Sequence, residues 1–506
     1  IAGPKPGIFL GNSWEQLFLS RHEVEIRRVK KYGKLFGVFE GKRAILHVAD
    51  PVLIKHILVK DFHAFTDRPL ATNAFTKSDV NQNLGAARGE QWRRMRTALT
   101  PMFTSGRLRR TYPLIGHCLR QLMAAMVESA DDGRPLDVYK AYECYAIDTI
   151  AAAAWGVETD AGHRPNDPLV SNARQIGQLQ GARRVLLWFI PRPVLKVMGV
   201  NTYRNARVAD TLRDLIRQLL DHRRGQQNGH DFISQMVRAR AGRVAVATTS
   251  TVPTGGDGID ATSSFEGHHI NEGDEHKEAV KRVLTISDNN NMNALNETEI
   301  INNSYIFFIA GYHQLVITLS YCTLELALNP RQQELLYAEV RAVAPEPDSE
   351  IPYDTLATLP YLDAVLSESM RIHASPYRLQ RYATADYRLP GTDLTIRAGQ
   401  EVHIPIYAIH HLDEHYPEPQ RFDPERFMGE RGRKLTPYTY LPFGAGPRSC
   451  VGMRFALLEV KYALAHIVRR YRFVRCPETN SRPPLANHFF LIVPKEVYVK
   501  IEPREH

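Results

Sequence analysis

Cysteine is scarce in this 506-residue chain, and the pattern of its five copies argues against two common uses. The count is odd, and no two cysteines form a Cys-x-x-Cys pair. We therefore expect neither a disulfide scaffold nor a structural zinc site, and we expect a reducing compartment. A signal peptide is also lacking. Because the chain begins at Ile1 rather than methionine, we expect an N-terminal piece to be missing.

Extremes of composition are absent as well. Hydrophobic residues make up 43% and charged residues 24% of the chain, which is typical of a globular protein and not of a disordered, collagen-like or coiled-coil one. The formal net charge of +9 is spread over a long chain. Such an excess fits nucleic acid, an anionic membrane surface or an acidic protein partner about equally well.

Hydrophobic periodicity predicts a mainly helical protein. Residues 35–39 and 44–48 alternate as in a β-hairpin, the pattern is helical from about 90 to 340, and a last helix is expected at about 451–470. Residues 240–295 are rich in serine, threonine, glycine and asparagine and contain few large apolar side chains. We predict a disordered insert there, because it cannot bury enough apolar surface to offset its ordering entropy.

One long segment, Ser304–Leu324, carries no formal charge over 21 residues and by length alone is a candidate membrane span. It contains six polar residues, which are costly in hydrocarbon, so we predict a helix buried in a soluble core instead. We expect Asn329 to cap the next helix and Pro330 to occupy its first position.

A glycine-rich segment at 443–452 precedes the predicted last helix and carries Cys450. Backbone N–H groups and the helix dipole at a helix N-terminus favour a thiolate. The glycines permit a flat ligand to approach the backbone, and Arg448 is placed to pair with an acidic group on it. Such a thiolate can be a nucleophile, a redox switch or a metal ligand. The commoner alternative is a buried free cysteine on a turn.

This segment resembles the haem-binding loop of the cytochrome P450 family, Phe-x-x-Gly-x-Arg-x-Cys-x-Gly. The fixed positions are met by Phe443, Gly446, Arg448, Cys450 and Gly452. The resemblance implies a mainly α fold with small β-sheets, formed as a single catalytic domain over residues 1–506. It further implies haem b between the long buried distal helix and the cysteine-loop helix, with Cys450 as the iron ligand.

A second match is the family's Glu-x-x-Arg pair, here Glu368 and Arg371, which lie three residues apart and so share a helix face. Taken alone, the two residues would be a surface ion pair. In the family an arginine from a later Pro-Glu-Arg-Phe segment joins them, and Arg426 occupies that position. By resemblance the triad is structural and supports the cysteine loop.

A third match is the Trp-x-x-x-Arg pattern of Trp92 and Arg96. By resemblance these two residues bind a haem propionate together with Arg381 and Arg448. Residues 92–110 hold six arginines and no acidic residue. We expect this stretch to be a basic face that docks an acidic, flavin-containing reductase.

The chain departs from the family on the distal helix. After Ala-Gly-x the family usually places an acid and then an alcohol that deliver protons, and this chain has His313 and Gln314. Histidine can relay a proton near neutral pH, and glutamine can hydrogen-bond water or oxygen but cannot ionise. We assign both residues to catalysis, while an interior histidine without proton traffic remains an alternative for His313.

Three functions follow from the resemblance, which extends to both the microsomal drug-oxidising 3A-type enzymes and thromboxane synthase. The first is a monooxygenase that oxidises lipophilic small molecules with O2 and electrons passed from NADPH by NADPH-cytochrome P450 reductase. The second is a haem-thiolate isomerase of a lipid peroxide, which needs no reductase. The third is a non-catalytic haem sensor or carrier.

The family also indicates the substrate pocket and the location. The residues expected to line the pocket are Phe308, Ile309, Ala310, Ser375 and Pro376. The apolar run at 185–191 is either core or a loop that dips into a membrane. By resemblance we expect the cytosolic face of the endoplasmic reticulum membrane, with the anchor helix absent from this chain and no nucleic-acid partner.

Overall fold

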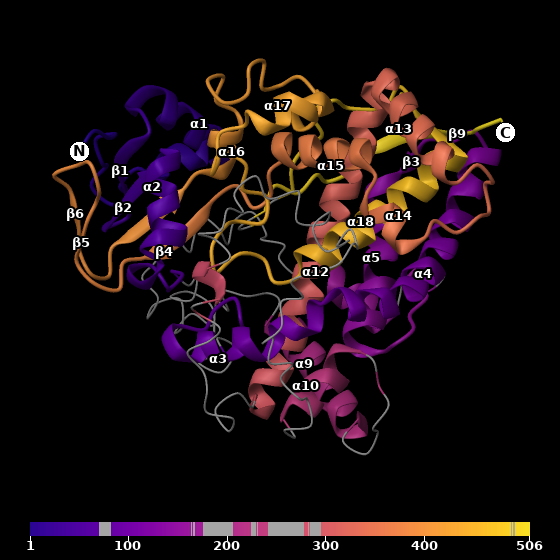
Figure 1. The fold of residues 1–506 in the computed structure, drawn as a ribbon, viewed down its shortest axis with the longest axis horizontal. Coiled ribbons are helices and arrows are strands. Elements are labelled where there is room, and N and C mark those ends of the chain that lie inside the picture. Colours follow the sequence, from indigo (N-terminus) through magenta and orange to yellow (C-terminus); the bar gives the residue numbers. More distant parts are fainter. Residues whose placement is uncertain are drawn as a thin grey trace, which may run out of the picture.

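The computed structural model describes residues 1–69, 82–162, 167–175, 206–223, 231–240, 278–281, 295–486 and 491–505, with a few single positions between them. The predicted disordered insert at 240–295 falls almost wholly outside the described residues, and the apolar run at 185–191 falls entirely outside them. In the described part, helices predominate and the strands form small sheets (Figure 1). The prediction of a mainly α protein is confirmed.

The larger sheet joins the N-terminal region to a late part of the chain. Strands β1 (Leu35–Glu40) and β2 (Arg43–Val48) form the predicted antiparallel hairpin. Strand β2 runs parallel to β7 (Glu401–Ile404), which pairs antiparallel with β4 (Leu379–Tyr382). Residues 401–404 therefore lie beside the N-terminal hairpin, and 379–382 form the next strand of the same sheet, on one side of the molecule (Figure 1).

Two further sheets are short. One contains β3 (Leu136–Asp137), β9 (Tyr498–Pro503) and β8 (Tyr471–Val474), and the other contains β5 (Tyr387–Arg388) and β6 (Thr395–Ile396).

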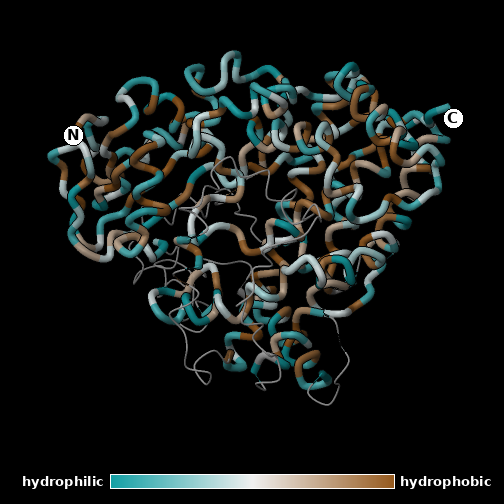
Figure 2. Tube along the Cα trace, in the orientation of Figure 1, coloured by the Kyte–Doolittle hydropathy of each residue, from teal (hydrophilic) through white to brown (hydrophobic). Residues whose placement is uncertain are grey.

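The helices fill the rest of the molecule. Their bounds are α1 Arg21–Tyr32, α2 Pro51–Lys55, α3 Gly89–Leu99, α4 Ser105–Asp131, α5 Val138–Trp155, α6 Pro168–Gln175, α9 Ala206–Arg223, α10 Phe232–Arg240, α12 Glu297–Leu328, α13 Pro330–Val343, α14 Tyr353–Ala357, α15 Pro360–Ile372, α16 Ile406–His410, α17 Gly429–Arg433 and α18 Met453–Arg470. Short 3-10 or π turns are η1 Ser13–Leu17, η2 His56–Lys60, η3 Phe62–Ala64, η6 Thr100–Phe103 and η7 Pro424–Phe427. Hydrophilic segments gather on the outer loops, and hydrophobic segments lie among the helices (Figure 2).

Helix α12 runs through the core and confirms the prediction of a buried helix. Asn296 caps it, since its side chain accepts the Glu299 N–H at 2.8 Å while the Glu299 carboxylate accepts the Asn296 N–H at 3.0 Å. Phe308 is fully buried and stacks on Trp155 of α5 with ring centroids 4.4 Å apart. Among the described helices, α12 alone is long and apolar enough to cross a membrane, and it lies largely inside the protein.

The junction between α12 and α13 corrects one prediction. Helix α13 does begin at Pro330, but the Asn329 side chain does not cap it. The amide of Asn329 instead donates to the carbonyl of Glu325 at 2.8 Å, which satisfies a terminal acceptor of α12. Asn329 does occupy the N-cap position of α13, but its side-chain oxygen makes no capping bond, because the amide group is turned toward Glu325 at the end of α12.

Candidate functional site

A cavity of about 670 Å³ lies between α12, α3, the segment after α15 and the loop before α18. Its apolar lining includes Phe103, Ile150, Phe232, Ile306, Phe307 and Leu491. Cys450 also lines this cavity, although it lies more than 120 residues after the end of α12 in the sequence. A cavity of this size with mostly apolar walls suits a small lipophilic ligand together with a flat cofactor.

Cys450 lies two residues before Gly452, the residue that precedes α18. Its N–H donates to the carbonyl of Phe443 at 2.9 Å, which closes the loop on itself. The Cys450 side chain is exposed to the cavity, yet desolvation by the surrounding protein raises the pKa of its thiol, although the Gly452 N–H and the charges of Arg96 and Arg68 act to lower it. The helix terminus expected to favour a thiolate is thus outweighed by desolvation. A bound metal cation would supply the missing positive charge.

Gly446 shows why this loop is rich in glycine. Its φ is +73°, and a Cβ at this position would lie 1.8 Å from the carbonyl oxygen of Leu58 in η2. Any other residue would both strain the backbone and collide with it. The cysteine loop is therefore packed directly against the backbone of the N-terminal part.

Five arginines line the cavity, and four of them lie close enough to repel one another: Arg68, Arg96, Arg381 and Arg448. The side chains of these four bond mainly to backbone oxygens. Arg96 donates to the carbonyl of Ser449 at 2.9 Å, and Arg68 donates to the carbonyl of Arg448 at 2.6 Å. The Nε of Arg381 is buried and has no hydrogen-bond partner among the described residues.

This cluster concentrates positive charge with little compensation. Burial, followed by repulsion from Arg68 and Arg381, lowers the pKa of Arg448 to about 7, and burial also lowers the pKa of Arg96 to about 10. In the described part of the chain, the carboxylate paired with Arg448 is that of Asp67, at 3.9 Å. Since buried charges require counter-charges, the cluster fits a ligand that brings its own carboxylates.

Trp92 contributes an aromatic surface to the same cluster. The guanidinium of Arg448 lies over its ring at 4.2 Å from the centroid, a cation–π contact, and Phe62 packs nearby at 5.5 Å. Arg68 was missed by the sequence analysis. A single arginine after a turn carries no periodic signal, and only the fold brings it beside Arg448.

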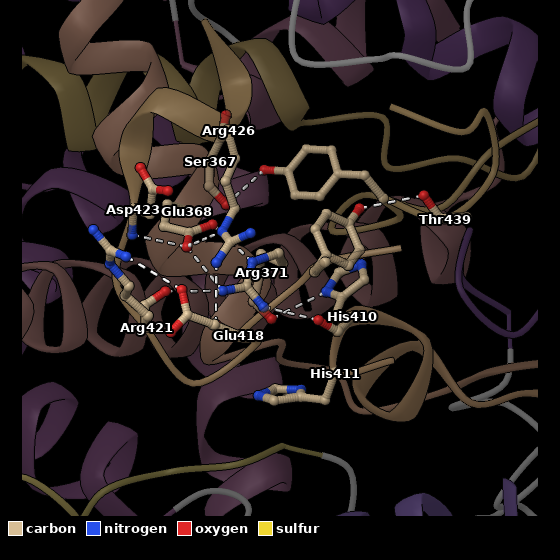
Figure 3. Close-up of polar contacts among 12 residues, drawn as sticks. Ser367, Glu368, Arg371, His410, His411, Glu418, Arg421, Asp423, Arg426 and Thr439 are labelled. Atoms are coloured by element: carbon tan, nitrogen blue, oxygen red, sulfur yellow. Dashed lines mark hydrogen bonds and ion pairs between the residues drawn. The ribbon is translucent and has the colours of Figure 1, made fainter. Parts of the chain in front are cut away.

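The Glu368, Arg371 and Arg426 side chains meet in the core (Figure 3). Arg371 donates to both carboxylate oxygens of Glu368, at 2.7 and 2.8 Å, and Arg426 adds a third bond at 3.2 Å. The Asp423 N–H donates to the same carboxylate at 3.0 Å. Because Glu368 and Arg371 are fully inaccessible, this is a buried and well-bonded ion network.

The network reaches the cysteine loop through His410 (Figure 3). Arg371 donates to the His410 carbonyl at 2.8 Å, and the His410 Nδ1–H donates back to the Arg371 carbonyl at 3.2 Å. The remaining ring nitrogen accepts the N–H of Leu441 at 3.0 Å. Leu441 directly precedes the Pro442–Phe443 start of the loop, so the triad and the loop form one connected unit.

Not all residues expected in the pocket reach it. Ala310, Ser375 and Pro376 line the cavity, whereas Phe308 and Ile309 do not. Phe308 faces Trp155, and Ile309 packs partly buried against the helical core. The cavity wall on α12 is instead built mainly from positions at three- and four-residue steps: Ile306, Phe307, Ala310, Gly311, Gln314, Leu315, Ile317, Thr318 and Tyr321.

The same periodicity separates the two residues assigned to catalysis. Gln314 lines the cavity, but His313 is not among the residues on its wall. The His313 Nδ1 lies 3.2 Å from the Ile309 carbonyl, and its ring lies 5.4 Å from that of His488. The cavity wall therefore includes Gln314 but not His313, and the assignment of both residues to catalysis stays a prediction.

The predicted basic face at 92–110 is divided by the fold. Arg94 pairs with the buried Glu299, Arg109 donates to Asp354 at 2.6 Å, and Arg96 points to the cavity. The segment itself contains no acidic residue, but carboxylates from other elements, Glu299 and Asp354, pair with Arg94 and Arg109. The six arginines do not form one unpaired docking surface.

Comparison with known proteins agrees with this geometry. The family model described as Cytochrome P450 matches residues 1–501, and the chain belongs to the cytochrome P450 family. Thromboxane-A synthase of Sus scrofa is 33% identical over all of this chain and 92% of the relative. Cytochrome P450 3A2 of Rattus norvegicus is 31% identical with the same coverage. The predicted family, and its likeness to both kinds of relative, are confirmed.

Membership implies a haem iron as cofactor, and the residues present fit it. The Cys450 sulfur on the cavity wall suits an iron ligand, and the four arginines suit the two propionates of haem b. The orphaned Nε of Arg381 and the glycine positions of the loop agree with a flat anionic group.

Proposed function

We propose that the protein is a haem-thiolate monooxygenase that oxidises lipophilic small molecules, with electrons passed from NADPH by NADPH-cytochrome P450 reductase. The observation that carries this proposal is the one cavity that Cys450 and the apolar residues of α12 both line. Similarity to the 3A-type relatives supports the same reaction class.

Haem supplies the dioxygen chemistry when bound, and this chain's residues hold and shape its surroundings. Cys450 would hold the iron through its sulfur, while Arg68, Arg96, Arg381 and Arg448 would bind the carboxylates. The apolar side chains that line the cavity exclude water, and they favour lipophilic substrates because such substrates bury apolar surface against them. The triad around Glu368 keeps the sulfur loop in place through His410 and Leu441.

Gln314 is the polar residue that we place at the reacting centre. Its amide can hold a water or a ligand oxygen but cannot release a proton, so it positions rather than protonates. Thr318, one turn further along α12, also lines the cavity and carries a hydroxyl. Proton delivery in this proposal therefore passes through water held by Gln314 and Thr318.

A second candidate is isomerisation of a lipid peroxide. Two observations favour it: Gln314 replaces the alcohol of the family pattern, and Thromboxane-A synthase is among the similar proteins. A substrate that brings its own O–O bond needs neither reductase nor protons from the wall. The two candidates therefore differ in what Gln314 contributes.

Restoring the alcohol separates the two reactions. In a monooxygenase, Gln314→Thr is expected to raise the reductase-driven rate about tenfold or more, since a positioned proton donor is worth on the order of 100-fold. In an isomerase, the variant leaves peroxide turnover without NADPH unchanged. The measurement is NADPH consumption coupled to product formation, beside isomerisation of a cyclic lipid peroxide without reductase.

His313→Ala serves as the matched control on the same helix. Because His313 is off the cavity wall, we expect the coupled NADPH oxidation rate to stay at the unchanged protein's level. A large loss in His313→Ala would restore this histidine as a relay. Peroxide isomerisation without any NADPH-dependent product would reject the monooxygenase in favour of the second candidate.

The location at the endoplasmic reticulum membrane is also a proposal, supported by an apolar N-terminal surface. Ile8, Phe9 and Phe18 are exposed by 93%, 86% and 79%, and Trp14 by 46%. Several large apolar side chains so close together in sequence are suited to insertion at a lipid surface.

Vesicle binding tests this surface. The double variant Phe9→Ser/Phe18→Ser is expected to reduce co-sedimentation with phosphatidylcholine vesicles at least severalfold, because both rings leave the lipid. Val52→Ser, which changes an exposed residue on α2, provides the control and should sediment like the unchanged chain. Equal sedimentation of all three proteins would remove the N-terminal surface from the proposal.

A further inference from the structure

The turn at 83–87 forms part of the cavity wall. Asn83 organises it, because its side-chain oxygen accepts the N–H groups of Gly85 at 2.9 Å and Ala86 at 3.1 Å. Asn83, Leu84, Gly85 and Ala86 all line the cavity. The position of this turn therefore affects the shape of the space offered to ligands.

The same turn binds Arg448, one of the four clustered arginines of the cavity. The Leu84 carbonyl accepts a bond from one guanidinium nitrogen at 3.4 Å, and the Ala87 carbonyl accepts from the other at 2.6 Å. Arg448 is 3% exposed. The Thr66 carbonyl binds the Nε of Arg448 at 2.8 Å, so the two carbonyl groups of the turn fix the direction of the guanidinium together with this third one.

Asn303 connects the turn to α12. Its side-chain oxygen accepts the Leu84 N–H at 2.8 Å, and its amide donates to the Glu299 carbonyl, one turn back on the helix, at 2.8 Å. The residue is fully buried. Leu84 is thus held on both sides, with its N–H bound to the distal helix and its carbonyl bound to Arg448.

A purely local role for Asn303 is the simpler interpretation, since buried amides are usually bonded somewhere. The hydrogen-bond partner of Asn303 speaks for more than a local role. Leu84 lies 219 positions away and belongs to a loop, which unlike a helix has no regular packing of its own to hold it in place. The neighbouring Ser304 is equally buried, yet its hydroxyl has no hydrogen-bond partner among the described residues. Burial on this helix therefore does not by itself produce such a link.

We propose that Asn303 is a positioning residue for the cofactor, which acts by fixing the turn at 83–87 and, through it, Arg448. The inference rests on haem binding but not on which of the two reactions the enzyme performs. Loss of the Asn303 oxygen frees the Leu84 N–H, loosens the two carbonyl groups and weakens the hold of Arg448 on the cofactor's carboxylates. Asn303 touches neither the cofactor nor the substrate in this account.

Haem release from the holoprotein tests the role. Asn303→Leu removes both hydrogen bonds at similar volume and is expected to speed haem transfer to excess apomyoglobin about tenfold, the size of one lost hydrogen bond. Asn303→Asp keeps an oxygen for the Leu84 N–H, so its release rate should stay within about twofold of the unchanged protein. Ser304→Ala, the matched control, should release haem at the unchanged rate.

Chemical denaturation of the same variants separates positioning from general stability. A role limited to stability predicts that Asn303→Asp and Asn303→Leu lose haem in proportion to their unfolding midpoints, and that result would overturn the inference. Unchanged haem release in Asn303→Leu would also overturn it. If Asn303→Leu does not fold, Asn303→Ala takes its place, and we expect it to release haem faster than Asn303→Asp by the same factor. An unchanged protein that binds no haem would overturn the proposed function as well.

Discussion

Replacing Cys450 by alanine is expected to abolish the thiolate-type band of the reduced carbon monoxide complex and to bring turnover below detection. The sulfur lies on the cavity wall, and no other cysteine among the described residues does so. Alanine removes the only atom at this position that can donate electron density to a metal. The carbon monoxide difference spectrum of the reduced protein measures the effect directly.

Cys476→Ala provides the control for this substitution. Cys476 is half-buried beside Thr479, with its sulfur 3.2 Å from the Thr479 hydroxyl, and it is remote from the cavity lining. Its spectrum should match that of the unchanged protein. A thiolate-type band that persists in Cys450→Ala would show that another group binds the metal, and the assignment of the site would fail.

The second large effect is expected from Glu368→Ala. The substitution leaves Arg371 and Arg426 buried without the carboxylate that both of them bind. Breaking a buried ion network in this way costs about 3–5 kcal/mol, against a typical net stability of roughly 5–15 kcal/mol. We expect a much lower midpoint of chemical denaturation and loss of haem incorporation, because the connection through His410 to the cysteine loop depends on Arg371.

Glu430→Ala is the matched comparison. Glu430 also pairs with a cation, Lys434 at 3.6 Å, but both side chains are about four-fifths exposed. Water already solvates such a pair, so its removal should leave the denaturation midpoint nearly unchanged. Equal midpoints for Glu368→Ala and Glu430→Ala would mean that the buried network contributes no more than a surface pair.

Features encoded by fixed spacing were accessible from the sequence. The cysteine loop is contiguous in sequence, so one motif identifies Cys450 and Gly446 together. The three-residue step from Glu368 to Arg371 places these two residues on the same helix face. The 35–48 hairpin and the α18 helix follow from simple periodicity in the same way. Each of these depends on local geometry that the chain cannot easily escape.

Features that depend on which elements meet were not accessible. The helical pattern predicts that residues around 310 form a buried helix, but it does not show which face of the helix meets the cavity. For this reason the sequence did not reveal that Phe308 and His313 lie off the cavity wall. Likewise, Arg94 had no visible partner until the fold brought Glu299 to it. Apolar residues lie on all sides of α12, so the polar–apolar contrast that normally orients a helix is weak.

The wide separation of the cavity's components in the chain has a consequence for biosynthesis. The contact between Arg68 and the Arg448 carbonyl joins positions 380 residues apart. At common rates of translation, roughly 20 to 80 seconds pass between the appearance of the first and of the second. Through that interval the early arginines have neither the sulfur loop nor a cofactor to hold, so capture of haem belongs to the final stage of maturation, when nearly the whole polypeptide has left the ribosome.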